Sequence, residues 1–181
     1  MGLATAGTSQ AANAELTLTY SCTFMLIGAQ DMPSKVTAEG LPDAAVVGQP
    51  TAEASTKVVT TVSQQASDVL NWLGATTVEG SLTTTIPVDN AGTAQNLTST
   101  LTIPKSPVGT GIFDVTATGT LAPMTFANAG TARTGLGDAE LTLTPRLSDG
   151  SETFLGTLKA PCVVKPGQNT QLHQFEVTAT E

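Results

Sequence analysis

Few side chains in this 181-residue chain could do covalent chemistry. His173 is the sole histidine, so it could act as a general base beside a nucleophile but could not build a multi-histidine metal site. It stands in the polar stretch QLHQ (residues 171–174), and the sequence has no G-x-S-x-G, P-loop or H-E-x-x-H motif. We therefore expect His173 to be exposed to solvent rather than catalytic.

A pair of carboxylates is the second candidate for chemistry. Asp138 and Glu140 share the phase of one expected strand, close to the segment GLG at residues 135–137. Such a pair could bind a hard cation such as Ca²⁺ or act as an acid and a base. Two donors are too few for a calcium site, so we favour a solvated strand end. The sequence thus predicts no catalytic, metal-binding or cofactor-binding residues, no cofactor and no enzyme.

The two cysteines, Cys22 and Cys162, form the third candidate. From Leu16 to Phe24, apolar residues alternate with hydroxyl-bearing ones, which is the period of a strand with one buried face. Cys22 lies in the apolar phase, and Cys162 holds the same phase in the segment LKAPCVV near the far end. We predict a structural disulfide between them in an oxidising compartment; two reduced, buried thiols in a cytosolic protein are the alternative.

The charge composition makes nucleic acid and anionic membranes unfavourable partners. The chain carries a formal charge of −8, and only 12% of its residues are charged. Nucleic acid and anionic membranes recruit clustered Lys and Arg, so both are disfavoured. No run of 18 apolar residues occurs, so we expect no membrane insertion. A protein partner or self-association remains open.

The elements that would position these residues are mostly strands. Alternating segments at about 10–15-residue spacing predict nine or ten strands. Residues 62–73 carry the only helical pattern, with Thr61 as the N-cap residue, Gln64 completing a capping box and Gly74 ending the helix. We expect Trp72 to pack against the sheet edge, and Phe154 to lie in the apolar phase of a strand. The predicted fold is all-β, an antiparallel immunoglobulin-like sandwich with one short helix.

The N-terminal segment differs from the rest in composition. Residues 1–14 are small and uncharged, and Ala12-Asn13-Ala14 has the A-x-A form of a signal-peptidase site. We interpret residues 1–14 as a signal-peptide remnant or a flexible tail, and residues 15–181 as a single domain.

Seven short segments occur in a fixed order along residues 17–162, namely TLTYSCTF, AVVGQP, VEG, LTIPK, TATGT, LTLTP and LKAPC. In these segments the chain resembles a family of secreted and cell-surface domains of unknown function from actinobacteria. The resemblance implies export, one disulfide and no known chemistry, and it supplies no catalytic or binding residues.

These observations lead to an expected class of function. We expect a non-catalytic module, secreted or displayed at the surface of a Gram-positive bacterium. It would act as a structural or adhesive unit, or as an adaptor, through protein contacts at its strand edges. The alternative is a module that binds a small ligand, either a glycan or calcium.

Overall fold

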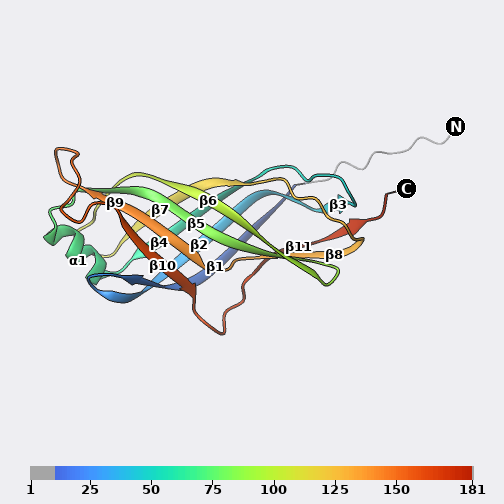
Figure 1. Cartoon of the computed structure of the whole chain (residues 1–181), viewed down its shortest axis with the longest axis horizontal. Coiled ribbons are helices and arrows are strands. Elements are labelled where there is room, and N and C mark those ends of the chain that lie inside the picture. The colour runs from blue at the N-terminus through green and yellow to red at the C-terminus, as the bar shows by residue number, and fades with distance from the viewer. Residues whose placement is uncertain (1–10, 181) are drawn as a thin grey trace.

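A computed structural model describes residues 11–180, and eleven strands and one helix account for most of them (Figure 1). The alternation of apolar and hydroxyl-bearing residues becomes long strands whose apolar side chains point inward. The elements are β1 (Ala11–Phe24), β2 (Gly28–Pro42), β3 (Ala44–Val46), β4 (Ala54–Val62), α1 (Gln64–Trp72), β5 (Thr77–Asn90), β6 (Thr93–Pro107), β7 (Phe113–Leu121), β8 (Gly130–Gly135), β9 (Ala139–Arg146), β10 (Leu158–Val164) and β11 (Gln171–Thr178).

Eight of the strands close into a barrel. Around the ring they run β5-β6-β7-β4-β2-β1-β10-β9, and β9 then pairs with β5 again. The predicted immunoglobulin-like sandwich is therefore wrong, although the all-β class and the single short helix are confirmed. A sandwich and a barrel share the same alternation of inward and outward residues, so periodicity did not distinguish them. The pairing of β9 with both β10 and β5 is what closes the sheet.

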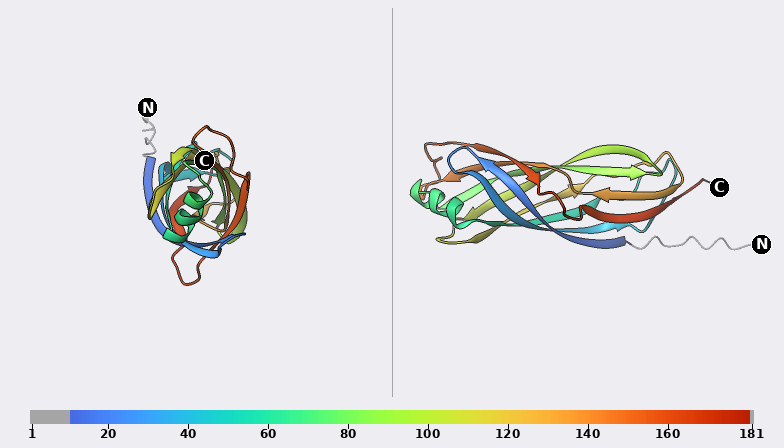
Figure 2. Two further views of the ribbon diagram at one scale, coloured as in Figure 1. Left: turned by 90° about the vertical axis from the view of Figure 1, so that its left-hand side faces the viewer. Right: turned by 90° about the horizontal axis from the view of Figure 1, so that it is seen from below.

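Three further strands extend the barrel away from the helix. The long strand β5 pairs with β9 along residues 77–84 and with β8 along residues 88–90. β11 pairs with β8, and β3 adds to β11 in parallel. The molecule is consequently elongated, with α1 at one end and β3, β8 and the C-terminus at the other (Figure 1). An end-on view shows α1 lying across the mouth of the barrel (Figure 2).

The helix begins and ends close to the predicted positions but uses a different cap. Ser63, not Thr61, is the N-cap residue, and its hydroxyl oxygen accepts a hydrogen bond from the Ala66 backbone N–H at 3.2 Å. Thr61 still belongs to β4, where its hydroxyl donates to Asp114. Gly74 has a φ of 74° just after the helix, as expected for a residue that ends it.

Two hydrophobic clusters fill the interior. The first lies toward the helix end and packs around residues such as Leu18, Met32 and Leu101. The second fills the opposite end, where the rings of Phe126 and Phe175 pack edge to face at 5.3 Å between centroids. Tyr20 lies within the first cluster and is 7% exposed.

The predicted disulfide is confirmed. Cys22 on β1 and Cys162 on β10 are directly opposite each other and are bonded. Residues 11–14, which we assigned to the N-terminal tail, begin β1 and pair with β2. Residues 1–10, which carry the rest of that prediction, lie outside the described part of the chain. Within residues 11–180, no helix has the length and apolar character needed to span a membrane.

Candidate functional site

An apolar cavity of about 320 Å³ opens at the helix end of the barrel. We call it the end cavity. Its lining is contributed by α1, the β1–β2 turn, the β9–β10 loop and the tips of the strands that surround the mouth. The lining side chains belong to Phe24, Met25, Leu26, Ile27, Met32, Val62, Ala66, Val69, Leu70, Leu73, Val78, Phe113, Val115, Leu143, Pro145, Leu155, Thr157, Leu158 and Lys159.

The inner face of α1 forms one side of the end cavity. Ala66, Val69, Leu70 and Leu73 recur at helical spacing and therefore share that face. Ala66 and Leu73 are 8% and 7% exposed. Because alanine and valine are short, this face does not reach the opposite wall, and space is left beneath the helix.

Hydrogen bonds fix α1 to the loops beside it. The buried Ser67 hydroxyl and the Asn71 side-chain amide both donate to the Gly109 carbonyl, each at 2.8 Å. On the other side, the Ser63 hydroxyl donates to the Gln30 side-chain carbonyl at 2.9 Å. The helix is thus held to the β6–β7 loop and to the start of β2, so its height above the barrel is set by polar contacts outside the cavity.

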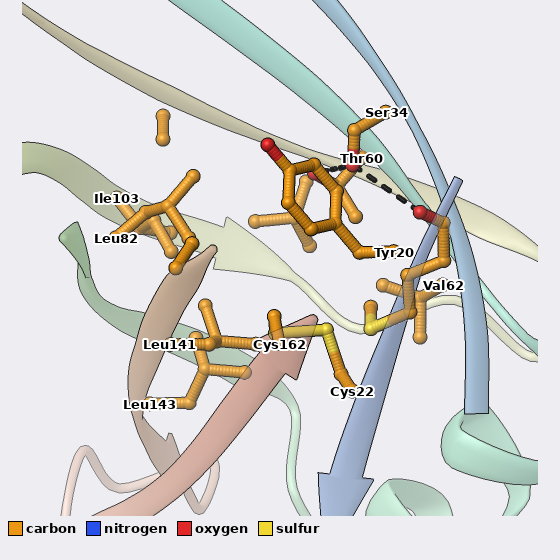
Figure 3. A pocket seen from close by; sticks show the side chains of 14 residues that line it. Tyr20, Cys22, Ser34, Thr60, Val62, Leu82, Ile103, Leu141, Leu143 and Cys162 are labelled. Atoms are coloured by element: carbon orange, nitrogen blue, oxygen red, sulfur yellow. Dashed lines mark hydrogen bonds between the residues drawn. A yellow bond between two sulfur atoms is a disulfide. The ribbon is translucent and has the colours of Figure 1, made fainter. Parts of the chain in front are cut away.

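The floor of the end cavity separates it from the barrel interior. Met32, Val62, Val115 and Leu143 line both the end cavity and an inner cavity of about 40 Å³. Figure 3 shows the inner cavity, with the Tyr20 ring beside the disulfide and the aliphatic side chains. The inner cavity is too small for an organic ligand, which would have to stay above this floor.

Polar groups in the inner cavity are mostly paired. The Tyr20 hydroxyl donates to the Gly137 carbonyl at 3.3 Å, and the Ser34 and Thr60 hydroxyls are 2.8 Å apart. Burial raises the pKa of Tyr20 to about 12. The phenol therefore stays protonated at neutral pH and acts as a hydrogen-bond donor in the wall rather than as a base.

Little of the end cavity is polar. Lys159 and Thr157 stand at its edge, and the Lys159 ammonium is 3.0 Å from a Glu140 carboxylate oxygen. The remaining lining is hydrocarbon, aromatic ring or thioether. Such a cavity can remove an apolar molecule from water, and nothing in this lining points to bond-breaking chemistry.

The residues that the sequence singled out do not meet at this site. Asp138 and Glu140 serve different partners: Asp138 accepts from the Val164 backbone N–H, and Glu140 pairs with Lys159. No group of three or more metal-binding side chains occurs in the described residues. His173 lies at the opposite end and is half-buried rather than exposed as predicted, because its ring stacks on Phe175 and its Nε2 lies 2.9 Å from the Pro42 carbonyl.

Two aromatic residues lie elsewhere than the sequence predicted. Trp72 is 74% exposed instead of packing on the sheet edge, and Phe154 is 76% exposed in the β9–β10 loop instead of facing the core. Their rings pack edge to face with 6.1 Å between the ring centroids, and the next residue along the chain from each, Leu73 and Leu155, lines the end cavity. The sequence offered one overlooked signal, which is the apolar pair Met25 and Leu26 in a strand-to-strand turn, where polar residues are usual.

Comparison with known protein families identifies the family of this chain. Residues 19–173 match DUF6801, a family of unknown function. The chain belongs to this family. No curated protein and no solved structure matches the chain. The predicted membership of a family of unknown function is confirmed, and the DUF6801 match runs from Thr19 in β1 to the third residue of β11.

Proposed function

We propose that this DUF6801 domain is a non-catalytic binding module that holds a small apolar molecule in the end cavity. The observation that carries the proposal is the 320 Å³ volume with its almost entirely apolar lining. Cavities of about 150 Å³ lined by aliphatic side chains bind benzene, so this one has room for roughly a dozen carbon atoms. The same lining favours an apolar ligand over the glycan or calcium ion considered from the sequence.

The proposed location is outside the cell. The Cys22–Cys162 disulfide supports this location, because disulfides form and persist in oxidising compartments. Together with the resemblance of motifs such as LTYSCTF and LKAPC, this supports export to the surface or surroundings of an actinobacterium.

Binding of 1-aminonaphthalene, measured by calorimetry, tests the ligand proposal. At about 0.5 kcal/mol per heavy atom, an apolar molecule of this size should bind with a dissociation constant on the order of 100 μM. The variant Val69→Trp fills the cavity from α1 and should abolish binding. Asp68→Trp adds the same side chain to the exposed side of α1 and should bind as the natural protein does.

The outcome of this comparison decides the proposal. Unfolding curves of both variants establish that they remain folded. If the folded natural protein takes up no 1-aminonaphthalene and no larger apolar probe, the end cavity is not a ligand site. If Val69→Trp stays folded and binds as well as Asp68→Trp does, the ligand lies elsewhere.

A protein-contact function is the second candidate, and one edge of β1 favours it. Residues 11–18 of β1 pair with β2 on one side, whereas β10 begins to pair with β1 only at Tyr20. No ladder joins this part of β1 to β11 in the described chain. β11 approaches part of β1 without pairing with it, and the part of the edge that β11 leaves uncovered can add a strand from another chain, as an adaptor or adhesive unit would require.

Capture of partner proteins from culture supernatant by the purified domain tests whether the free edge of β1 binds another chain. Asn13→Lys with Thr17→Lys places charge on exposed positions of the free edge and should abolish capture of a partner or self-association. Thr118→Lys is the matched control, because Thr118 is exposed on β7, which has a neighbouring strand on each side. Capture that survives the edge variant, or is lost equally in the control, would count against this function.

A further inference from the structure

Five of the seven exposed large apolar side chains in the described residues lie at one end of the molecule. They are Met25 at 89%, Leu26 at 51%, Trp72 at 74%, Ile112 at 67% and Phe154 at 76% exposure. We call these five residues the apolar rim. They come from four separate segments, namely the β1–β2 turn, the end of α1, the β6–β7 loop and the β9–β10 loop.

Exposed large apolar side chains are concentrated in the apolar rim and are not spread evenly over the surface. Among the described residues, the other exposed large apolar side chains are Val46 and Val163, and they are less exposed than most of the rim. Single exposed apolar residues are ordinary, whereas a cluster indicates a surface that contacts something apolar.

The apolar rim and the end cavity are continuous. Met25 and Leu26 belong to the rim and also line the cavity. Trp72 is the last residue of α1, whose inner face forms the cavity wall. In the end-on view, α1 and the surrounding strand ends face the viewer together, so the segments that carry the rim belong to the same end of the molecule (Figure 2). Apolar material passing from the rim into the cavity would not cross water.

Charge at this end argues against an anionic surface. Acidic side chains stand on the rim-bearing segments, with Asp68 on α1 and Asp149 and Glu152 in the β9–β10 loop. Two nearby basic side chains are engaged in ion pairs, Arg146 with Glu79 and Glu152 and Lys159 with Glu140. Lys105, exposed near the end of β6, has no ion pair among the described residues, so this end carries one isolated cation rather than a basic cluster. Together with the net charge of −8, this leaves a neutral lipid surface as the partner that fits.

We infer that the apolar rim docks on a neutral lipid surface, and that the molecule held in the end cavity is a single hydrocarbon chain taken from it. The inference rests on the proposed function, since it names the class of ligand and its source. The rim would sink its loop side chains to the depth of the lipid headgroups, with Trp72 at the boundary between water and lipid.

Sedimentation with phosphatidylcholine vesicles tests the docking step. The natural protein should bind, and the emission of Trp72, the sole tryptophan, should shift to shorter wavelength. Met25→Gln with Phe154→Gln should weaken the partition on the order of a hundredfold, because each large apolar side chain withdrawn from lipid costs roughly tenfold or more. Val46→Gln with Val163→Gln, outside the rim, is the matched control and should bind normally.

Three outcomes would overturn the inference. They are the absence of vesicle binding, binding that appears only when anionic phosphatidylglycerol is added, and equal binding by the rim and control variants. Concentration-dependent dimerisation that is lost in the rim variant, without vesicle binding, would assign the rim to a second copy of the chain instead.

The ligand step has its own readout. Natural protein recovered from vesicles that contain monoacyl phosphatidylcholine should carry the monoacyl lipid, detected by native mass spectrometry. Val69→Trp should dock on the same vesicles but carry none. If the natural protein binds 1-aminonaphthalene but neither docks nor carries lipid, the lipid inference fails while the proposed function stands; if it binds neither probe nor lipid, both fail.

Discussion

The Cys22–Cys162 disulfide should contribute a large share of the free energy of unfolding. The cysteines are 140 residues apart, so the bond restricts nearly the whole unfolded chain. The chain-entropy relation gives about 5 kcal/mol for a loop of this length at 25 °C. A typical domain has a total stability of about 5–15 kcal/mol, so the effect should be easy to measure. The bond also fastens a short seam of the barrel, because β1 and β10 pair over only three residues each.

The measurement requires reduction in the unfolded state. Each cysteine is 3% exposed, so a reductant reaches the sulfurs only when the barrel opens. Protein unfolded in guanidinium with phosphine reductant, and then refolded with reductant present, should melt about 10–20 °C lower than the oxidised protein. Urea unfolding followed by circular dichroism gives the corresponding free energy.

A double variant separates the covalent link from packing. Reduction removes the bond but keeps both sulfurs in place, whereas Cys22→Ala with Cys162→Ala also removes their packing beside the inner cavity of about 40 Å³. The double variant should therefore be less stable than the reduced protein. A reduced protein within about 1 kcal/mol of the oxidised one would refute the loop-closure reasoning.

Three further predictions follow from single side chains. Tyr20 is the sole tyrosine, and burial raises its pKa from 10.0 to about 12. Its contribution to stability is complete below pH 10 and should fall by roughly 2–3 kcal/mol as the pH rises to about 12. Phenolate absorbance should therefore titrate near 12 in the folded protein and near 10 in guanidinium; a folded midpoint near 10 contradicts this. Gly80→Ala should cost about 3 kcal/mol or more in urea unfolding, because a Cβ would lie 1.9 Å from the Thr142 carbonyl oxygen where β5 meets β9; unchanged stability would contradict it. Ser63→Ala should cost about 1 kcal/mol through the lost N-cap, and Thr61→Ala should cost less; equal losses would return the cap to Thr61.

Much of the strand content could be predicted because its signal is local. The alternation around Cys22 and Cys162 fixed which face each residue takes, and two cysteines on buried faces had each other as the only partner. β8 could not be predicted, because its residues, GTARTG, include a single apolar side chain and so show no alternation of apolar and polar residues. Phe126 is 1% exposed without belonging to any strand, so alternation could not identify it.

The barrel and the end cavity depend on contacts that no local pattern contains. Closure of the barrel requires β9 to pair with β5, which lies about 60 residues earlier in the chain, as the pairing of Leu82 with Leu141 shows. The sequence predicted the helix, but not that it would lie across the mouth rather than on a sheet face. Phe154 illustrates the consequence, since its apolar type suggested the core, whereas its loop projects it beside Trp72.

The two ends of the barrel differ in how they are filled, and this difference bears on function. At the far end, Phe126 and Phe175 occupy the interior with packed rings. At the helix end, α1 presents the shorter Ala66 and Val69, and the bonds to Gly109 prevent it from sinking inward. An empty enclosed void of 320 Å³ would cost about 8 kcal/mol at roughly 24 cal/mol per Å³. That cost is a large share of the stability of an ordinary domain, so an occupied or open cavity is favoured over an empty closed one. This supports our proposal of an apolar ligand, because an apolar lining offers water few hydrogen-bond partners.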